Sequence, residues 1–365
     1  MNIGLLTLPL YVNYVGFLQV YALTTILARF GFRVILITHK MSLTFKSLLK
    51  EVGVCIYNLV GLLSHRYTQR VILKKENEDF DIFCNKHIKD TVSNEAISKR
   101  KIQLDALVVG SDQVWRSWDS TALGYNYLDF AIPLKIKRIA YAVSFGTNKL
   151  TVSKEIADKI SSLVKRFDRV SVREHDGIFL CKNIFRAQAS HVLDQALLLF
   201  KNDYLKFLYD SHFDKKQIST YILDNDEFKK SIIRAIEREL GKMFYSLYDE
   251  PDKTKNIRKV QKRTSIECWL TRFMASKFLI IDSFHGTAFA INFNIPFIVL
   301  ANADRGNSRL QSLLDIFELQ ERLVVDVKDA VSVFEKPKSW ERVNLIRDEH
   351  VKSSLGFIKD SLSLH

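Results

Sequence analysis

Short apolar runs alternate with amphipathic stretches along the chain, and this alternation is the feature that most constrains its fold. Residues 3–8 form a first apolar run, and residues 16–30 then carry apolar side chains at helical spacing. Gly31 is typical of a helix end, and residues 32–38 follow as a second apolar run. The pattern predicts a β-α-β unit with two buried parallel strands.

The same alternation continues in two successive sets of elements. It predicts strands at residues 105–110, 138–144 and 169–172 with helices at 153–165 and 175–181, and, after a polar stretch at 201–216, strands at 218–223, 277–282 and 296–300. We therefore expect an α/β protein with two doubly wound Rossmann-like domains facing a cleft, at residues 1–200 and 201–335. Residues 340–362 are predicted to be helical, and residues 336–365 to pack back across the pair.

The predicted cleft is the place where a ligand is expected. Open α/β sheets bind their ligands beyond the carboxyl ends of the parallel strands. A chain of 365 residues is also long enough to form more than one hydrophobic core. Residues that directly follow a predicted strand are therefore the first candidates for a functional site.

The chain carries an excess of positive charge. Lys and Arg outnumber Asp and Glu by 54 to 41, which gives a formal net charge of +13. Such an excess suggests an anionic partner, whether a phosphorylated substrate, an anionic lipid or a nucleic acid. The densest basic run, residues 253–263, has no interleaved aromatic residue for stacking on bases, so we expect no nucleic-acid binding.

Neither the cysteines nor the apolar N-terminus indicates a special environment. Cys55, Cys84, Cys181 and Cys268 are widely separated and lack metal-ligand spacing, so we expect reduced thiols and no bound metal. The uncharged residues 3–28 are interrupted by polar side chains, with no basic residue before them and no cleavage site after them. These features favour a cytoplasmic protein with a basic surface suited to peripheral contact with the inner membrane face.

The segment Gly110-Ser111-Asp112-Gln113-Val114-Trp115 directly follows a predicted strand. Small, acidic, amide and aromatic side chains are thereby placed at the cleft. Asp112 is a candidate to accept a proton from a sugar hydroxyl, and Trp115 is a candidate to stack on an apolar sugar face. The alternative is a helix cap followed by a tryptophan of the core.

A second constellation, Asp282-Ser283-Phe284-His285-Gly286-Thr287, joins a buried strand to an apolar helix. His285 falls in the first helical turn, where free N–H groups attract phosphate or carboxylate. The positive helix end favours a neutral imidazole until an anion binds, so His285 is a candidate acid once an anionic substrate arrives. Arg305 and Arg309 follow the next strand and suit bidentate binding of such an anion. A purely structural histidine is the alternative.

Charged residues also follow two other predicted strands. Arg173 is either an anion ligand or the partner of Glu174 in a salt bridge, and the simplest role for Asp194 is to cap a turn. The segment Asp224-Asn225-Asp226 has the form of a metal-nucleotide motif, but it falls at a predicted helix start, where Asp is expected as a cap. Neither a P-loop nor a GxGxxG motif is present.

These segments, in this order, resemble the polysaccharide pyruvyl transferase family. The resemblance spans roughly residues 3–325 and rests on Asn13-Tyr14-Val15-Gly16-Phe17-Leu18-Gln19, the segment from Gly110 to Trp115, Ser171-Val172-Arg173-Glu174, Val192-Leu193-Asp194, the segment from Asp282 to Thr287, and Arg305-Gly306-Asn307-Ser308-Arg309. It implies a glycosyltransferase-B-like pair of domains that transfers the enolpyruvyl group of phosphoenolpyruvate to a sugar diol. Some family members have Arg where this chain has Ser283, and we hypothesise that Arg305 or Arg309 supplies the missing contact.

The resemblance and the residues together give a predicted site. His285 and Asp112 are the predicted catalytic pair. The predicted donor contacts are Arg173, Ser283, His285, Gly286, Arg305 and Arg309, and the predicted acceptor contacts are Asn13, Gln19, Ser111, Gln113 and Trp115. We expect no cofactor besides the donor substrate, and we expect the acceptor to be a sugar or a lipid-diphosphate-linked oligosaccharide.

Two other functions fit the same architecture. A nucleotide-sugar-dependent glycosyltransferase would bind a nucleoside diphosphate and not phosphoenolpyruvate. A non-catalytic protein that binds saccharides or membrane surfaces would bind neither donor, and substitutions of its His and Arg residues would be silent.

Overall fold

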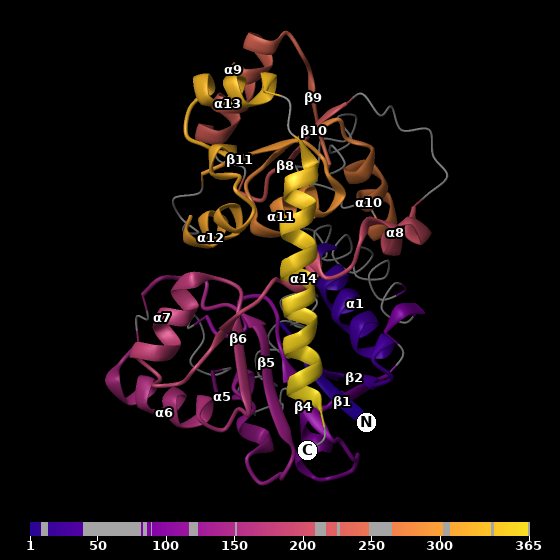
Figure 1. Ribbon diagram of the computed structural model, residues 1–365, viewed down its shortest axis with the longest axis vertical. Coiled ribbons are helices and arrows are strands. Elements are labelled where there is room, and N and C mark those ends of the chain that lie inside the picture. The colour runs from indigo at the N-terminus through magenta and orange to yellow at the C-terminus, as the bar shows by residue number, and fades with distance from the viewer. Residues whose placement is uncertain are drawn as a thin grey trace, which may run out of the picture.

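The protein has two α/β domains, each built on a parallel sheet (Figure 1). The computed structural model describes residues 1–8, 14–38, 82, 86–88, 90–116, 123–149, 152–208, 217–224, 227–247, 265–301, 307–336 and 339–363. Every strand pairing recorded within these residues is parallel, in the registers given by neighbours such as Leu6 beside Val109 and Ile281 beside Tyr221.

The first sheet has seven strands in the order β3-β2-β1-β4-β5-β6-β7. Their bounds are β1 Asn2–Leu6, β2 Arg33–Thr38, β3 Thr91–Ser93, β4 Ala106–Val109, β5 Lys137–Val143, β6 Arg169–Val172 and β7 Ser190–His191. The strand order reverses between β1 and β4, and such a reversal opens a crevice at the carboxyl ends of the two strands.

The second sheet has five strands in the order β12-β11-β10-β8-β9. Their bounds are β8 Ile218–Tyr221, β9 Phe244–Ser246, β10 Phe278–Ile281, β11 Phe297–Leu300 and β12 Leu323–Val324. Its reversal lies between β8 and β10. The central strands β10 and β11 are entirely apolar and buried, as expected of parallel strands covered on both faces.

Helices cover the faces of both sheets (Figure 1). Their bounds are α1 Tyr14–Arg29, α4 Asn94–Ser98, α5 Leu123–Asn126, α6 Lys154–Val164, α7 His175–Asn183, α8 Lys201–Tyr204, α9 Glu227–Leu240, α10 Ile266–Ala275, α11 Phe284–Phe293, α12 Ser308–Ile316, α13 Val327–Glu335 and α14 Trp340–Leu362, with short 3-10 turns at Asp129–Ala131 (η2), Gln195–Leu197 (η3), Leu205–Phe207 (η4) and Gln320–Arg322 (η5). Serine hydroxyls accept backbone N–H groups at several helix starts, as Ser153 does at α6 and Ser265 at α10. These caps supply acceptors that the first helical turn lacks.

One hydrophobic cluster runs without interruption from the first domain into the second. It contains side chains of α1 and β1 together with side chains of α10, α11 and α14. The rings of Tyr14 and Trp269 stack across the boundary with centroids 5.3 Å apart and planes at 6°. Asn292 of α11 donates hydrogen bonds to the carbonyl oxygens of Ala196 and Leu199 at 2.9 and 2.8 Å. The domains are therefore joined by a core and not only by a linker.

The final helix, α14, lies along both domains (Figure 1). Arg347 near its start donates to the carbonyl oxygen of Asn292 in the second domain at 3.2 Å. Ser354 farther along accepts the backbone N–H of Leu193 in the first domain at 2.9 Å, and the ring of Phe357 lies 6.3 Å from that of Tyr141. The helix thus fastens one domain to the other.

Most strands and helices predicted from the sequence lie where they were expected, with ends that shift by one to a few residues. The predicted strand at residues 169–172 and the predicted helix at 340–362 coincide with β6 and α14. The predicted helix at 16–30 begins earlier, because α1 starts at Tyr14. Strands of the first sheet fall within residues 1–200 and those of the second within 201–335. The predicted domain limits themselves stay predictions.

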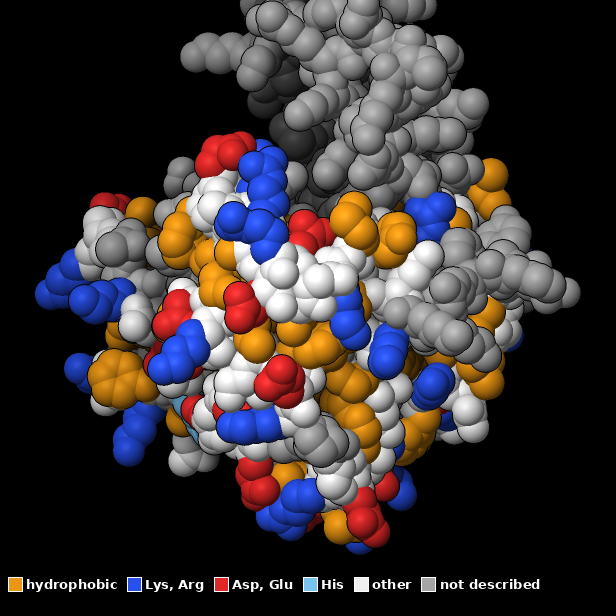
Figure 2. All heavy atoms as spheres, turned by 90° about the horizontal axis from the view of Figure 1, so that it is seen from above, with side chains coloured by type: hydrophobic (Ala, Val, Ile, Leu, Met, Phe, Trp, Pro, Cys, Tyr) orange, Lys and Arg blue, Asp and Glu red, His pale blue; other side chains and the backbone are white. Residues whose placement is uncertain are grey.

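The outer face of the second domain carries charges of both signs. In the view of Figure 2, Lys and Arg side chains are interspersed with Asp and Glu side chains and with scattered apolar ones. The described part of that face therefore has no broad field of one sign. Among the helices that the structure describes, none combines the length and the apolar character that a membrane crossing requires.

The shared core predicts how the protein responds to a cavity at the boundary. Trp269 is fully buried and contacts the rings of Tyr14, Tyr221 and Phe289, so Trp269→Ala should lower the free energy of unfolding by roughly 3–5 kcal/mol. Denaturant titration followed by far-UV circular dichroism measures this change. The exposed Val325→Ala serves as the control, with an expected change below about 0.5 kcal/mol. A small loss for Trp269→Ala would contradict a shared core.

Candidate active site

The carboxyl ends of the two sheets bring together residues that are far apart in sequence. Asp112 follows β4, Arg173 follows β6 and Asp194 follows β7 in the first domain. His285 lies in the first turn of α11, directly after β10 of the second domain. The cluster spans the boundary at the edges where ligands of open α/β sheets bind.

Arg173 is the centre of this cluster. Its side chain is 0% exposed, and its Nη1 donates to Asp194 Oδ2 at 2.7 Å and lies 3.0 Å from His285 Nε2. Its Nη2 donates to Asp112 Oδ1 at 3.1 Å. The guanidinium carbon also lies 4.3 Å from the centroid of the Phe284 ring, a cation–π contact. One buried cation thus contacts two carboxylates and the imidazole.

Asp194 is held from several directions. Gln19 Nε2 donates to its two carboxylate oxygens at 3.1 and 3.0 Å, and Ser111 Oγ donates to Oδ2 at 3.1 Å. The backbone N–H of Ala196 donates to Oδ1 at 2.9 Å. Burial alone would raise the pKa of Asp194, but Arg173, His285 and the backbone N–H of Ala196 hold that pKa below its ordinary value. Asp194 is therefore ionised and pairs with Arg173.

Asp112 is the carboxylate of the cluster that reaches solvent. Its side chain is 16% exposed, and its backbone adopts the left-handed conformation with φ of 63°. Burial raises the pKa of Asp112, while His285, Arg173 and Arg309 lower it, and the balance lies below the ordinary value. The turn before it needs a glycine, because a Cβ on Gly110 would lie 2.0 Å from the carbonyl oxygen of Tyr141.

His285 lies beside this network and is a neutral imidazole. Because a guanidinium only donates, Nε2 accepts the hydrogen bond from Arg173, and the proton of the neutral ring lies on Nδ1. Burial lowers the pKa of His285 to about 4, and the positive charges of Arg173 and Arg309 oppose the two nearby aspartates. The side chain is nevertheless 14% exposed, so a ligand can reach it.

Arg309 contributes a second buried guanidinium, from the first turn of α12. The residue is 7% exposed, it makes no ion pair within the described residues, and its Nε has no hydrogen-bond partner there. Burial lowers its pKa to about 10, so the group still carries its charge at neutral pH. Arg173, Glu174, Asp112 and Arg116 all lie near enough to influence it. A buried cation without a counter-ion is costly unless an anion joins it.

The start of α11 is shaped by two small residues. The hydroxyl oxygen of Ser283 accepts the N–H of Gly286 at 3.2 Å and so caps the helix. A Cβ on Gly286 would lie 2.6 Å from Ile281 Cγ2, so a glycine is required for packing. The N–H groups of Phe284 and His285 have no acceptor inside the helix, because they belong to its first turn.

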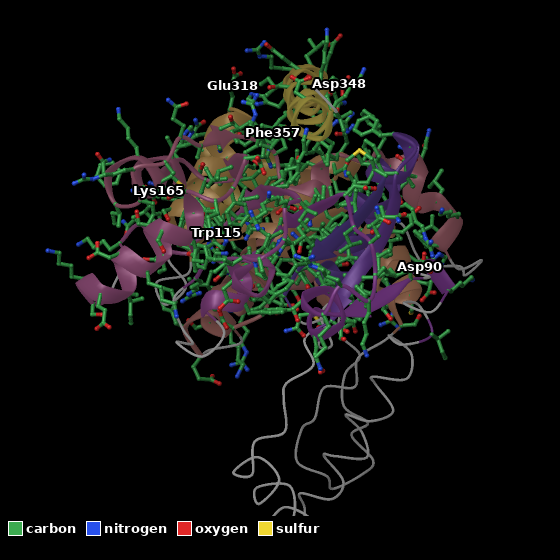
Figure 3. The ribbon with its side chains drawn as sticks, turned by 90° about the horizontal axis from the view of Figure 1, so that it is seen from below. Asp90, Trp115, Lys165, Glu318, Asp348 and Phe357 are labelled. Atoms are coloured by element: carbon green, nitrogen blue, oxygen red, sulfur yellow. The ribbon has the colours of Figure 1, made fainter. Side chains whose placement is uncertain are left out.

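Three predicted acceptor residues are buried inside the first domain. Gln19 and Ser111 donate to Asp194, and Gln19 also donates to Ser111 Oγ at 2.8 Å. Trp115 is 1% exposed, stacks on Tyr127 with centroids 4.8 Å apart, and lies inside the domain in Figure 3. Trp115 is therefore a tryptophan of the core, which is the alternative given for it above, because its ring is too buried for a sugar to stack on it. Gln19 and Ser111 orient the cluster and do not face an acceptor.

Some of the remaining predicted residues are described by the structure, and others lie outside the described residues. Gln113 is partly exposed, and its Oε1 accepts a hydrogen bond from Arg116 at 2.6 Å. Asn13 and Arg305 lie outside the described residues. Asp282, in the predicted motif, is structural, since it accepts the N–H groups of Leu223 and Asp224 and pairs with Lys229 at 2.8 Å.

Sequence reasoning undervalued two carboxyl groups. Asp194 has the predicted role of a turn cap through the N–H of Ala196, and it is also the main partner of Arg173. Glu174 forms the expected ion pair with Arg173, with Oε2 3.7 Å from Nε, and its Oε1 also accepts the backbone N–H of Phe145 at 2.9 Å. Both residues lie directly beyond the end of a strand, and this shared position could have identified them as candidates for the site.

No metal centre is evident in the part of the chain that the structure describes. Its His, Cys, Asp and Glu side chains form no group of three or more that could hold a metal ion. The expectation of a metal-free reaction stays a prediction.

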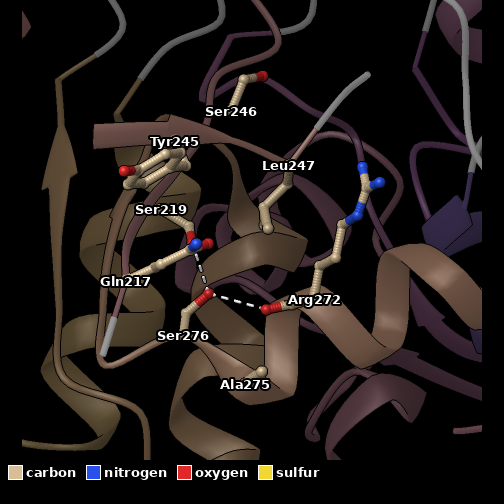
Figure 4. Close-up of a pocket in the computed structure, with 8 residues that line it drawn as sticks. All are labelled: Gln217, Ser219, Tyr245, Ser246, Leu247, Arg272, Ala275 and Ser276. Carbon is tan, nitrogen blue, oxygen red and sulfur yellow. Dashed lines mark hydrogen bonds between the residues drawn. The ribbon is translucent and has the colours of Figure 1, made fainter. Parts of the chain in front are cut away.

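A separate pocket of about 220 Å³ lies in the second domain (Figure 4). It lies between β8, β9 and α10 and is lined by hydroxyl, amide and aromatic groups, among them Ser219, Tyr245 and Ser276. Ser219 and Ser276 share a hydrogen bond at 2.7 Å. None of the predicted catalytic or donor-binding residues lines this pocket.

Comparison with known families and structures supports one assignment. The sequence profile of the polysaccharide pyruvyl transferase family matches residues 16–305. The matched range contains Asp112, Arg173, Asp194 and His285. A search of curated proteins finds no match.

Solved structures share the two-domain arrangement at low sequence identity. UDP-GlcNAc 2-epimerase from Methanocaldococcus jannaschii superposes with a TM-score of 0.55 at 13% identity, over 94% of this chain and 95% of that one. The UDP-GlcNAc-bound enzyme of the same name from Neisseria meningitidis gives a TM-score of 0.55 at 11% identity, over 99% of each chain. The glycotransferase of kitacinnamycin gives 0.50 at 10% identity, over 99% of each chain. The predicted glycosyltransferase-B-like fold is thus confirmed.

The neutral state of His285 can be tested directly. Its ring signals in NMR should titrate with a midpoint near pH 4, and they should vanish in His285→Gln. Because the unfolded chain binds this proton at a pKa near 6.5, lowering the pH from 6.5 to 4 should cost the wild type on the order of 3 kcal/mol more than it costs His285→Gln. A midpoint near 6.5 would contradict the burial of this group.

Proposed function

Because the chain belongs to the polysaccharide pyruvyl transferase family, we propose that it transfers the enolpyruvyl group of phosphoenolpyruvate to a sugar diol as a ketal. The observation that carries the proposal is Arg309, a buried guanidinium that makes no ion pair with the residues that the structure describes and that lies near the neutral imidazole of His285. A donor with both phosphate and carboxylate groups supplies the missing negative charge.

The donor binds between Arg309 and the start of α11 in this proposal. The first-turn N–H groups of Phe284 and His285 and the positive end of the helix favour an anion. Arg309 then supplies the contact that an arginine at position 283 makes in other family members, since this chain has Ser283 there. Arg305 is a second candidate for the same contact.

Arg173 has a positioning role in this scheme. Its two terminal nitrogens already donate to Asp194, His285 and Asp112, and its side chain is 0% exposed, so the guanidinium is held by protein partners and is less accessible to a donor. The guanidinium instead orients the imidazole and the Asp112 carboxylate relative to each other. This assignment modifies the expectation that Arg173 clamps the donor.

The reaction uses His285 as acid and Asp112 as base. The charge of the bound donor raises the pKa of His285, which then takes up a proton and delivers it to the methylene carbon of the donor. Asp112 takes the proton of the first sugar hydroxyl as its oxygen bonds to the ketal carbon. Phosphate then leaves and the second hydroxyl closes the ketal. Of the two hydroxyl protons, one ends in the new methyl group and one on phosphate.

The acceptor in this proposal is a sugar of a growing surface polysaccharide, carried on a lipid diphosphate. The net charge of +13 suits an anionic carrier and peripheral contact with a membrane surface. Asp112 and His285 are the solvent-reaching groups of the cluster, so the acceptor approaches from their side.

Turnover of phosphoenolpyruvate tests the proposed function. Incubation with phosphoenolpyruvate and candidate glycans should release phosphate and add the mass of a pyruvate ketal to the sugar. His285→Ala should abolish both while thermal unfolding shows a folded protein. Stabilisation by a nucleoside diphosphate, without phosphate release from phosphoenolpyruvate, would instead favour a nucleotide-sugar glycosyltransferase. Binding of neither donor would favour a non-catalytic saccharide-binding protein.

Arg309 should determine donor affinity. Arg309→Gln removes a charge-assisted contact and should weaken binding of phosphoenolpyruvate roughly 10- to 100-fold. Isothermal titration calorimetry measures the affinity, and the exposed Arg166→Gln is the matched control with unchanged binding. An unchanged affinity in Arg309→Gln would move the donor contact to another residue.

A further inference from the structure

The pocket between β8, β9 and α10 has no part in the scheme above (Figure 4). It lies at one end of the second sheet, where β9 is the terminal strand of the described order β12-β11-β10-β8-β9. Its volume of about 220 Å³ falls below the roughly 300–1,000 Å³ that is usual for pockets of larger ligands. The space therefore suits a ligand about the size of a single sugar ring.

The strand register places the ring of Tyr245 beside the hydroxyl of Ser219. The two residues are neighbours in the parallel pairing of β8 with β9, so their side chains leave the sheet on the same face. Tyr221, two residues after Ser219, is on that face too, and its ring centroid lies 5.3 Å from that of Trp269 on α10. The pocket thus lies on the face of the sheet that α10 covers.

The ring of Tyr245 reaches solvent from the lining of the pocket. Tyr245 is 50% exposed, whereas Leu247, two residues later on the same side of the chain, is 2% exposed. An aromatic ring with half of its surface in water can stack on the apolar face of a ligand. The pocket therefore combines a buried apolar side chain with an accessible aromatic ring.

Ser219 presents a hydrogen-bond acceptor to this space. Ser276 Oγ lies 2.7 Å from Ser219 Oγ and 2.9 Å from the carbonyl oxygen of Arg272 (Figure 4). A hydroxyl has one proton and a carbonyl oxygen only accepts, so both bonds form when Ser276 donates to the carbonyl and Ser219 donates to Ser276. The proton of Ser219 is then in use, and its oxygen offers lone pairs. A ligand with O–H groups fits these lone pairs, whereas an anion without a proton does not.

The other polar groups of the lining also complement a sugar. The side-chain amide of Gln217 can both donate and accept, and the guanidinium of Arg272 can donate. Among the described residues that line the pocket, none carries a carboxylate, so a cationic ligand has no partner there. A sugar ring has an apolar face of C–H groups and a rim of hydroxyls that donate and accept. An aromatic ring beside hydroxyl and amide groups matches both features.

We propose that this pocket is a second saccharide-binding site, which holds one neutral sugar unit with its C–H face on the ring of Tyr245 and a hydroxyl donating to Ser219 Oγ. The inference goes beyond the proposed function, because none of the residues in this pocket takes part in the transfer reaction. The site binds a sugar unit whether or not the protein transfers an enolpyruvyl group.

Saturation-transfer-difference NMR with methyl glycosides tests the site. The probes are the methyl glycosides of glucose, galactose, mannose and N-acetylglucosamine, without phosphoenolpyruvate. At least one should bind with a Kd of about 1 mM, and saturation transfer should be strongest to the C–H groups of one ring face. Tyr245→Ala should weaken this binding roughly tenfold or more, and Tyr245→Phe, which keeps the ring, by less than about threefold. Ser219→Ala removes the acceptor and should weaken it roughly 3- to 10-fold.

Two control variants locate the bound sugar. Phe228→Ala removes another exposed aromatic ring of the second domain, which is 65% exposed on α9, and should leave glycoside binding unchanged. His285→Ala should also leave it unchanged, because His285 does not line this pocket. Since Tyr245 is half exposed, Tyr245→Ala should fold like the wild type, which thermal unfolding checks.

Several outcomes would overturn the inference. Failure of all four glycosides to bind would exclude a sugar site, and equal binding in the wild type and Tyr245→Ala would remove the ring from it. Binding that is lost in His285→Ala and kept in Tyr245→Ala would assign the sugar to the catalytic cluster. Sulfate binding that Arg272→Gln abolishes, without binding of any glycoside, would identify an anion site instead.

Turnover distinguishes this inference from the proposed function. If the protein releases no phosphate from phosphoenolpyruvate but binds a glycoside through Tyr245, the function fails and the saccharide site stands. If turnover is normal and no glycoside binds, the saccharide site fails and the function stands.

Discussion

The burial of one positive charge, that of Arg173, is the constraint on which the arrangement of the site depends. A guanidinium removed from water is tolerated only when carboxylates and acceptors surround it. Here the two carboxylates come from the ends of β4 and β7 of the same domain, and α11 of the second domain adds the imidazole of His285 as a further acceptor. Gln19 and Ser111 then fix Asp194 in place. Arg309 differs, because among the described residues its buried charge has no such ion pair.

The sequence predicted most of the fold because the fold depends on patterns that are local. Buried parallel strands are short apolar runs, and strand β10 with the helix after it has this signature in residues 278–293. Short edge strands such as β3 and β12, of three and two residues, lack such a pattern and were not predicted. Their position depends on neighbouring strands, which no window of sequence contains.

The candidate site was predictable in position but not in detail. Asp112, Arg173 and His285 were found because they directly follow strands, and the topology brings such residues together. Trp115 shows the limit, since the same segment holds a cleft carboxylate and a core ring three residues apart. Which side of a loop faces the cleft is decided by tertiary packing. The placement of Asp194 against Arg173 likewise depends on a hydrogen bond from Gln19, which lies 175 residues earlier in the chain.

The helix α14 has a consequence for how such proteins diversify. Its side chains contact α11 of the second domain and β5 of the first, and the hydrophobic cluster beneath it belongs to both. An exchange of one domain between relatives would therefore expose apolar surface unless the incoming half matched both α1 and α14. The two halves therefore depend on each other for packing, and a change in a loop at the cleft disturbs this shared core less than the exchange of a whole domain.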